Sequence, residues 1–319
     1  MKDVIQELSL IGLVPVIKID DAKDAAPLAH ALEEGGLPCA EVTFRTAAAA
    51  EAIAEMVKAC PDMLVGAGTV LTTAQVDEAV AAGAKFIVSP GLNPPVGKYC
   101  VAKGIPVMPG INNPSGIEQA LELGLKVVKF FPAEPSGGLT MLKAMAAPYG
   151  GVKFMPTGGI SAANVGDYLA WNKIVACGGS WMVPPKMLAA GDFDGIRKLA
   201  REAVDTMLSF KFVHLGVNCA DEDDCSTSAS TAEQLFSFAR DERSKSVFAG
   251  PMEFMKAPGR GTMGHVAIGT PNVDRAVYHL TRRGARFDMD TATYDADGSM
   301  KFVYIADEIG GFAYHLVKA

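Results

Sequence analysis

Val127-Val128-Lys129-Phe130-Phe131-Pro132-Ala133-Glu134 places a lysine in the middle of a short apolar run. The run is typical of a buried strand, because parallel strands that are covered on both faces are continuously hydrophobic. Burial removes the hydration of an ammonium and favours the neutral amine, which is the nucleophile of Schiff-base chemistry. The alternative is a lysine at the end of the strand that extends its ammonium to water. The run alone leaves both interpretations open.

Seven similar runs surround this one, and alanine-rich stretches with helical character separate them. The eight predicted strands are 13–19, 39–44, 64–70, 86–90, 106–110, 127–132, 153–158 and 174–178. Eight such βα units in a chain segment of about 200 residues favour a closed (β/α)8 barrel over an open doubly wound sheet. No Gly-x-Gly-x-x-Gly motif follows the first strand, which argues against a dinucleotide-binding fold. We therefore predict an α/β protein with a TIM barrel over residues 1–208.

The composition is that of a globular protein, with 319 residues, 49% hydrophobic and 20% charged. This length is sufficient for a barrel and a small second domain. The net charge of −7 argues against nucleic acid as a partner. No apolar run reaches the roughly 18 residues that a membrane span needs, and the N-terminus lacks a signal-peptide core. We expect a cytoplasmic protein without a membrane partner.

The sequence pattern changes near residue 209, where a second domain, 209–319, is predicted. Residues 262–317 read as β-α-β-β-β, with Asn272 as the N-cap of the helix and Asp297-Gly298 as a hairpin turn. Residues 210–261 read as a shortened copy of the same unit. We predict a small α+β domain of the βαβββ type.

In a TIM barrel the chemistry lies at the carboxyl ends of the strands. The polar residues predicted there include Glu41, Arg45, Thr69, Lys129 and Thr157. Schiff-base catalysis also needs a group that moves protons. The barrel's only histidine, His30, falls in a predicted helix, so Glu41 is the candidate. The alternative role for Glu41 is a salt bridge to Arg45 or Lys129.

Two glycine-rich segments, Gly158-Gly159 and Gly178-Gly179-Ser180, follow the seventh and eighth strands. Exposed backbone N–H groups at this place in barrels commonly bind phosphate. The fork of Arg45 suits a carboxylate, with the Thr69 hydroxyl beside it. The pattern predicts a ligand with a carboxylate, a carbonyl at Lys129 and a distal phosphate.

Taken in order, these motifs resemble those of the 2-keto-3-deoxy-6-phosphogluconate and 4-hydroxy-2-oxoglutarate aldolases, which are class I enzymes on a trimeric (β/α)8 barrel. The resemblance covers about residues 1 to 205. It rests on Glu41-Val-Thr-Phe-Arg45-Thr, Gly66-Ala-Gly-Thr69, Ser89-Pro90-Gly91, Lys129-Phe-Phe-Pro-Ala-Glu134, Pro156-Thr157-Gly-Gly159 and Gly178-Gly179-Ser180. Phe44 stands where many relatives have leucine.

The resemblance implies a role for each of these residues. Lys129 would form the imine, and Glu41 would act as acid and base, partly through a water. Arg45 and Thr69 would bind the pyruvyl carboxylate. The remaining residues would line the pocket (Pro90, Phe131 and Thr157) or bind the phosphate (Gly158, Gly159, Gly179 and Ser180).

The implied reaction, a step of the Entner–Doudoroff pathway, cleaves 2-keto-3-deoxy-6-phosphogluconate to pyruvate and glyceraldehyde 3-phosphate. The same site would also or instead cleave 4-hydroxy-2-oxoglutarate to pyruvate and glyoxylate. The resemblance implies a homotrimer that acts on a small 2-keto acid without a cofactor or metal. The rival interpretation is an inactive barrel that senses a phosphate ligand together with the C-terminal domain.

The second domain resembles the glyoxalase/vicinal-oxygen-chelate modules, which hold a divalent metal with histidine, glutamine or glutamate on their strands. His214 and His265 fall on the equivalent first strands, and His315 falls on the last one. The first unit reads as shortened and the usual glutamate of the last strand as absent, so we predict no metal. The expected role is packing, oligomer contact or ligand sensing, with metal catalysis as the alternative.

Overall fold

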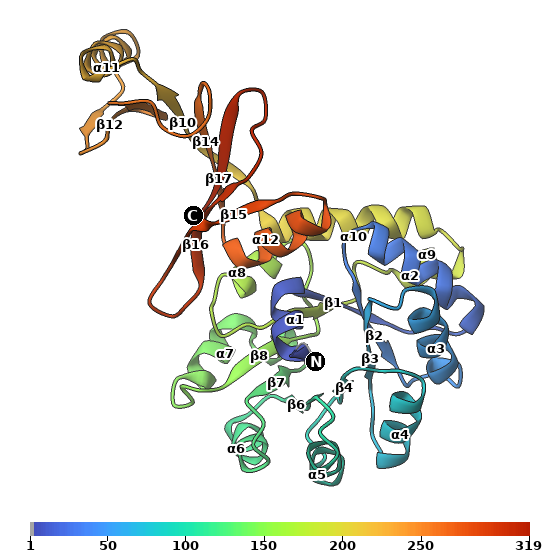
Figure 1. Cartoon of the computed structure of the whole chain (residues 1–319). Helices are drawn as coiled ribbons and strands as arrows, with labels where there is room; N and C mark the ends of the chain where they lie inside the picture. The colour runs from blue at the N-terminus through green and yellow to red at the C-terminus, as the bar shows by residue number, and fades with distance from the viewer. Residues whose placement is uncertain (1–2) are drawn as a thin grey trace. The chain divides into compact units, whose positions relative to one another are not determined.

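The computed structural model describes residues 3–319 and divides into two compact units, Met1–Met207 and Leu208–Ala319 (Figure 1). Each unit has its own sheet system. Within the described residues, no helix has both the length and the apolar character needed to cross a bilayer.

The first unit alternates strands and helices along its whole length. Its strands are β1 (Leu13–Ile17), β2 (Cys39–Thr43), β3 (Leu64–Gly68), β4 (Ile87–Val88), β5 (Val107–Met108), β6 (Gly110–Ile111), β7 (Val127–Phe130), β8 (Lys153–Pro156) and β9 (Cys177–Gly179). Its α-helices are α1 (Val4–Ile11), α2 (Ala25–Glu34), α3 (Ala49–Ala59), α4 (Thr73–Ala81), α5 (Pro94–Ala102), α6 (Pro114–Glu122), α7 (Gly138–Ala146), α8 (Val165–Leu169), α9 (Pro185–Ala189) and α10 (Phe193–Leu208). Two 3₁₀ turns, Ala22–Asp24 and Glu134–Ser136, complete it.

The strands of this unit form a closed parallel barrel. One sheet has the order β5-β4-β3-β2-β1-β9 and the other β6-β7-β8. β5 and β6 are two pieces of the predicted fifth strand, and they are separated at Pro109, which has no N–H to donate to a ladder. Bridges from Phe154 to Ile174 and from Thr157 to Gly178 join β8 to the β9 segment and close the ring. The predicted TIM barrel is confirmed.

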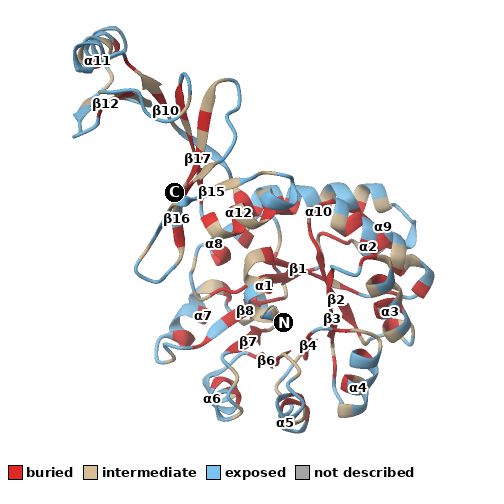
Figure 2. Ribbon diagram, viewed as in Figure 1, coloured by how far each residue is buried: buried red, intermediate tan, exposed pale blue. Residues whose placement is uncertain are grey.

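Burial explains why these short runs form the barrel wall. Every residue of β2, β3 and β7 is buried, as expected for parallel strands with helices outside and packed side chains inside (Figure 2). Side-chain caps define where several helices begin. Thr72 Oγ1 accepts a hydrogen bond from the N–H of Gln75, and Asn113 Oδ1 accepts one from Gly116.

The second unit contains two complete β-α-β-β-β repeats. The first consists of β10 (Lys211–Asn218), α11 (Glu222–Phe236), β11 (Arg240–Glu242), β12 (Ser246–Ala249) and β13 (Met252–Met255). The second consists of β14 (Gly264–Thr270), α12 (Val273–Arg282), β15 (Phe287–Tyr294), β16 (Met300–Ile305) and β17 (Phe312–Lys318). All eight strands form one sheet of order β11-β12-β13-β10-β14-β17-β16-β15.

Two details of the predicted second repeat are confirmed. Asn272 Oδ1 caps α12 by accepting from the N–H of Arg275 at 2.9 Å. Gly298, with φ of 83°, turns the chain between β15 and β16. Glycine is favoured at this position of the hairpin turn, because other residues rarely adopt a positive φ.

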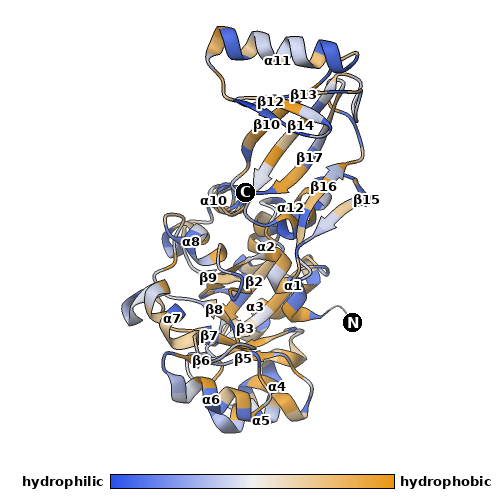
Figure 3. Ribbon diagram, turned by 90° about the vertical axis from the view of Figure 1, so that its left-hand side faces the viewer, coloured by the Kyte–Doolittle hydropathy of each residue, from blue (hydrophilic) through white to orange (hydrophobic). Residues whose placement is uncertain are grey.

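The first repeat is a shortened copy of the second in length, as predicted, but it has lost no strand. The first repeat has all its strands, but β11 and β12 are short, and β11 consists of the charged residues Arg240-Asp241-Glu242. The acidic segment 221–224 starts helix α11, because the Asp221 side chain caps the helix by accepting a hydrogen bond from the N–H of Asp224. Figure 3 shows that α11 contains both hydrophilic and hydrophobic residues. Its inner face contributes Cys225, Ala229 and Ala232 to a small apolar core.

Candidate functional site

A buried ion pair lies inside the barrel and joins β7, which is the sixth predicted strand, to β2. Lys129 Nζ, on β7, is 3.0 Å from Oε1 and 3.5 Å from Oε2 of Glu41, on β2. The Lys129 side chain is 6% exposed and that of Glu41 is 0% exposed. The structure therefore excludes the lysine that extends its ammonium to water. Of the two partners considered for Glu41, the structure pairs it with Lys129.

The neighbouring strand makes room for this pair. A Cβ atom added to Gly68 at the end of β3 would lie 2.2 Å from Glu41 Oε1. Real Cβ atoms do not approach other atoms so closely, and Glu41 is enclosed on every side. Only glycine at position 68 leaves the carboxylate its place beside the amine.

Arg45 and Thr69 lie in the segments that follow β2 and β3. Arg45 is exposed, and its Nε donates to Thr43 Oγ1 at 3.1 Å, which orients the guanidinium. Thr69 has a φ of 56°. This left-handed conformation costs a β-branched residue on the order of 1–3 kcal/mol, and such strain clusters at ligand sites.

Thr157 follows β8 and carries a buried hydroxyl. The residue is 5% exposed, and within the described residues its Oγ1 has no hydrogen-bond partner. A Cβ at Gly178 would lie 2.4 Å from this oxygen, so the strand beside it also makes room for it. A buried hydroxyl without a partner costs about 1–3 kcal/mol, which a ligand with a polar group would offset.

Phe131 and Pro90 border a cavity at the same end of the barrel. The Phe131 ring centroid lies 5.4 Å from Lys129 Nζ. The cavity has a volume of about 530 Å³, and both residues line it together with the segment after β6. A small organic acid fits a space of this size.

The two glycine-rich segments differ in structure. Gly158 and Gly159 form a turn with φ of 99° and 83°, which favours glycine. The turn is held in place, because the N–H of Glu134 donates to Gly158 O and Asn164 Nδ2 donates to Gly159 O. Gly179 instead ends strand β9 and is buried, and the exposed Ser180 follows it. The second segment was predicted to follow the eighth strand, and the structure instead places its two glycines within strand β9.

The family model of KDPG and KHG aldolases matches residues 4–199 of this chain. The chain belongs to this family. A 2-dehydro-3-deoxy-phosphogluconate aldolase of Treponema pallidum (strain Nichols) is 50% identical over 204 residues, which are 64% of this chain and 97% of the relative. The KHG/KDPG aldolase of Escherichia coli (strain K12) is 49% identical over 193 residues, which are 60% of this chain and 91% of the relative.

Solved structures agree with this assignment to the KDPG/KHG aldolases. The 2-keto-3-deoxy-6-phosphogluconate aldolase of Zymomonas mobilis ZM4 with 3-phosphoglycerate superposes with a TM-score of 0.60 at 45% identity. It covers 64% of this chain and 95% of its own. The KDPG aldolase of Legionella pneumophila, with pyruvate captured as a covalent carbinolamine, gives 0.61 at 38% identity and covers 64% of this chain and 99% of its own. The protein is accordingly an aldolase, a carbon–carbon lyase.

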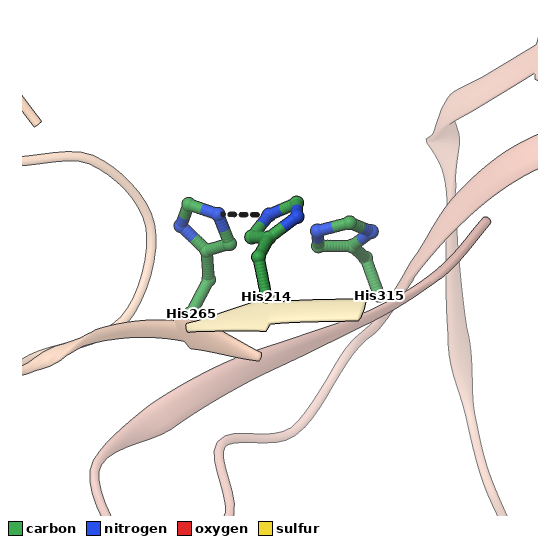
Figure 4. A group of neighbouring side chains, drawn as sticks. All are labelled: His214, His265 and His315. Atoms are coloured by element: carbon green, nitrogen blue, oxygen red, sulfur yellow. Dashed lines mark hydrogen bonds between the residues drawn. The ribbon is translucent and has the colours of Figure 1, made fainter. Parts of the chain in front are cut away.

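A second group of polar side chains lies in the second unit, beyond the end of the KDPG/KHG aldolase match. His214 on β10, His265 on β14 and His315 on β17 stand on one face of the sheet (Figure 4). One nitrogen of each ring lies within 4.8 Å of the others. The sequence singled out these three histidines, and the structure brings them together.

Glu253 completes this group and was missed by the sequence reasoning. Its Oε2 lies 3.1 Å from the Nε2 of both His214 and His265, and these two nitrogens are 3.1 Å apart. Glu253 lies on β13, the last strand of the first repeat, which the sequence pattern did not reveal. We refer to His214, Glu253, His265 and His315 as the His/Glu cluster.

The electrostatics of the His/Glu cluster favour a cation. Burial raises the pKa of the Glu253 carboxyl, but hydrogen bonds from His214, His265 and Ser246 outweigh this and hold the pKa well below its ordinary value. Burial, with the neighbouring His265 and His214, lowers the pKa of His315 to about 3. The cluster therefore presents a carboxylate and a neutral imidazole, the forms that bind metals.

Proposed function

We propose that the barrel is a Schiff-base (class I) aldolase in which Lys129 is the imine-forming amine and Glu41 moves the protons. The observation that carries the proposal is the buried Lys129–Glu41 pair, because an amine and a carboxylate in contact are the two groups that imine chemistry requires. The covalent carbinolamine named for the Legionella relative supports the same chemistry.

The reaction can be written with these two residues. Lys129 gives a proton to Glu41, and its Nζ attacks the C2 carbonyl of the keto acid to form a carbinolamine. Return of the proton to the departing hydroxyl releases water and leaves a protonated imine. Glu41, directly or through a water, then takes the proton of the C4 hydroxyl, and the C3–C4 bond breaks as the aldehyde leaves. The electron pair forms an enamine, which takes a proton at C3 and is hydrolysed to pyruvate and the free amine.

The other residues bind the substrate in this proposal. Arg45 and Thr69 hold the carboxylate, since a guanidinium fork matches a carboxylate in geometry. Thr157 offers its unpartnered hydroxyl, while Pro90 and Phe131 line the cavity. The phosphate lies against Gly158, Gly159, Gly179 and Ser180. The 3-phosphoglycerate in the structure of the Zymomonas relative supports a phosphorylated substrate. The ratio of kcat/KM for 2-keto-3-deoxy-6-phosphogluconate to kcat/KM for 4-hydroxy-2-oxoglutarate tests this preference.

Borohydride reduction in the presence of pyruvate tests the imine. We expect peptide mass spectrometry to find one reduced pyruvyl adduct, on Lys129, because reduction converts the imine to a stable secondary amine. Lys153, an exposed lysine on the adjacent strand β8, is the internal control and stays unmodified. An adduct spread over exposed lysines, or none on Lys129, contradicts the proposal and favours the inactive sensing barrel.

We also propose that the His/Glu cluster of the second unit binds one divalent metal ion, contrary to the expectation drawn from its sequence. His315 Nδ1 is buried and has no hydrogen-bond partner within the described residues. Three further donor atoms lie 3.1 Å from one another. Ligands on a single ion with bonds of about 2.1 Å are separated by roughly 3.0 to 3.4 Å, so this donor set fits such an ion.

Imidazole and carboxylate donors suit zinc, iron, cobalt or nickel. Such an ion would act as a Lewis acid toward the oxygen atoms of a bound ligand. Within the protein, Ser246 donates to Glu253 Oε1 at 2.6 Å and so orients the carboxylate toward the histidines.

Metal analysis of the full-length protein after dialysis tests this second proposal. We expect close to one divalent ion per chain, and at least about a tenfold loss of metal affinity in Glu253→Gln and His265→Ala, because the first replaces an anionic ligand by a neutral amide and the second removes a nitrogen ligand. Glu242→Gln is the matched control, since Glu242 is an exposed carboxylate of the same unit that pairs with Lys256. A protein that retains no divalent ion when supplied with zinc, cobalt or iron contradicts the proposal.

A further inference from the structure

The two repeats of the second unit are related by an internal two-fold that passes through the β10–β14 pair. Leu215 lies opposite Val266, His214 opposite Ala267, and Gly216 opposite His265. A rotation about this two-fold places β10 on β14 and His214 on His265, and it leaves the pairing of the two strands unchanged. The pairings of β13 with β10 and of β17 with β14 extend this relation, because Glu253 lies opposite Gly216 and His315 lies opposite Ala267.

The same relation continues outward to both edges of the sheet. Phe248 on β12 lies opposite Glu253, and Tyr304 on β16 lies opposite His315. Asp241 on β11 lies opposite Phe248, and Asp288 on β15 lies opposite Tyr304. The related pairs are His214 and His265, Glu253 and His315, Phe248 and Tyr304, and Asp241 and Asp288. Residues directly opposite one another share a face of the sheet, so each half presents an aromatic ring and an aspartate beside the His/Glu cluster.

An arginine completes each half. The Arg243 guanidinium lies 4.1 Å from the Phe248 ring centroid, and its Nε donates to Asp241 at 2.9 Å. The Arg260 guanidinium lies 5.0 Å from the Tyr304 centroid, and its Nη1 pairs with Asp288 at 2.8 Å. The two arginines do not occupy equivalent positions in the repeats, yet each is stacked on the equivalent ring and held by the equivalent aspartate.

The rings also contact the cluster. The Phe248 and His214 centroids are 5.4 Å apart, and those of Tyr304 and His315 are 5.1 Å apart. Each guanidinium is therefore separated from a cluster histidine by one aromatic ring. The arginine side chains are 58% and 51% exposed, and each uses a single described nitrogen for its aspartate. A guanidinium has five N–H donors, which leaves donors for a ligand.

We infer that this face of the second unit binds a small dicarboxylate that carries a 2-hydroxy or 2-oxo group, with one end on the metal ion and the other carboxylate on Arg243 or Arg260. The inference rests on the proposed metal site. A divalent ion outweighs the single negative charge of Glu253, so the centre attracts an anion. The planar fork of arginine is the side chain best matched to a carboxylate at the far end.

The aromatic rings determine the minimum length of the ligand. A ligand must cross one ring to touch both the ion and a guanidinium, which a two-oxygen group such as an acetohydroxamate is too short to do. The acid's chain is expected to lie along Phe248 or Tyr304.

Cobalt(II)-loaded full-length protein provides the test, with L-malate as the probe. L-malate carries no keto group and so forms no imine with Lys129, and the visible spectrum of cobalt responds only to ligands that reach the ion. We expect L-malate to change the spectrum, and Arg243→Gln and Arg260→Gln together to raise its Kd by about tenfold or more, because each removes charge-assisted hydrogen bonds. Acetohydroxamic acid, which binds the ion without a second anionic group, keeps its Kd in the double variant.

Arg286→Gln is the control, because Arg286 is an exposed arginine of the same unit that pairs with Asp307. Arg286→Gln removes one exposed positive charge of the same unit, and we expect it to leave the L-malate Kd unchanged. If cobalt binds normally but the L-malate Kd is the same in the double variant and the parent, the inference is overturned and the metal site stands. Failure to bind cobalt overturns both.

Discussion

Lys129→Ala abolishes aldol cleavage, with an expected fall in kcat of at least about 10⁴-fold, because the covalent route loses its nucleophile. No other amine replaces it, since Lys129 Nζ is the buried amine in contact with Glu41. The borohydride adduct with pyruvate disappears in the same variant. Steady-state cleavage of 2-keto-3-deoxy-6-phosphogluconate and peptide mass spectrometry give the two readouts.

Lys129→Arg separates the loss of the nucleophile from the loss of the ion pair. A guanidinium keeps the positive charge opposite Glu41 but stays protonated and forms no imine. We expect this variant to be as inactive as Lys129→Ala and to unfold at a temperature closer to that of the parent. Full activity in either variant rules out Schiff-base catalysis by Lys129.

The barrel and its central pair follow from the sequence for a physical reason. Parallel strands buried on both faces need continuous apolar runs, so the eight runs stand out, and Lys129 stands out within its run. Barrel closure then brings the ends of strands together irrespective of their separation in sequence, which predicts that Glu41 and Lys129 meet. The φ of Thr69 and the clearance at Gly68 depend on three-dimensional contacts and were not predictable.

The second unit was harder to predict because its repeats have diverged in sequence. The two-fold relates Glu253 to His315 and Phe248 to Tyr304, so no repeated motif marks the first repeat. Its strand β11 is three residues long and entirely charged, and lacks the apolar alternation by which strands are recognised. The metal-binding potential of Glu253 follows only from register, once the pairing of β13 with β10 is known.

The proton-transfer role of Glu41 predicts a different defect from that of Lys129. In Glu41→Gln we expect kcat to fall by roughly 10²- to 10⁴-fold, the usual contribution of a general acid and base. Lys129 keeps its nucleophile, so the borohydride adduct with pyruvate still forms, more slowly. Exchange of the pyruvate methyl protons in D₂O, followed by NMR, slows in parallel with cleavage because the enamine is no longer protonated efficiently.

Glu41→Gln keeps a carbonyl oxygen beside Lys129, whereas Glu41→Ala leaves a buried ammonium without a partner. Breaking a buried pair in this way costs on the order of 3–5 kcal/mol of unfolding free energy, so Gln rather than Ala reports on catalysis. Gly68→Ala tests the geometry independently, because its Cβ would meet Glu41 Oε1 at 2.2 Å and displace the carboxylate. Gly151→Ala, where a Cβ meets nothing within 4 Å, is the matched glycine control. If Glu41→Gln and Gly68→Ala both retain kcat and the proton-exchange rate of the parent, another group moves the protons and the role assigned to Glu41 is wrong.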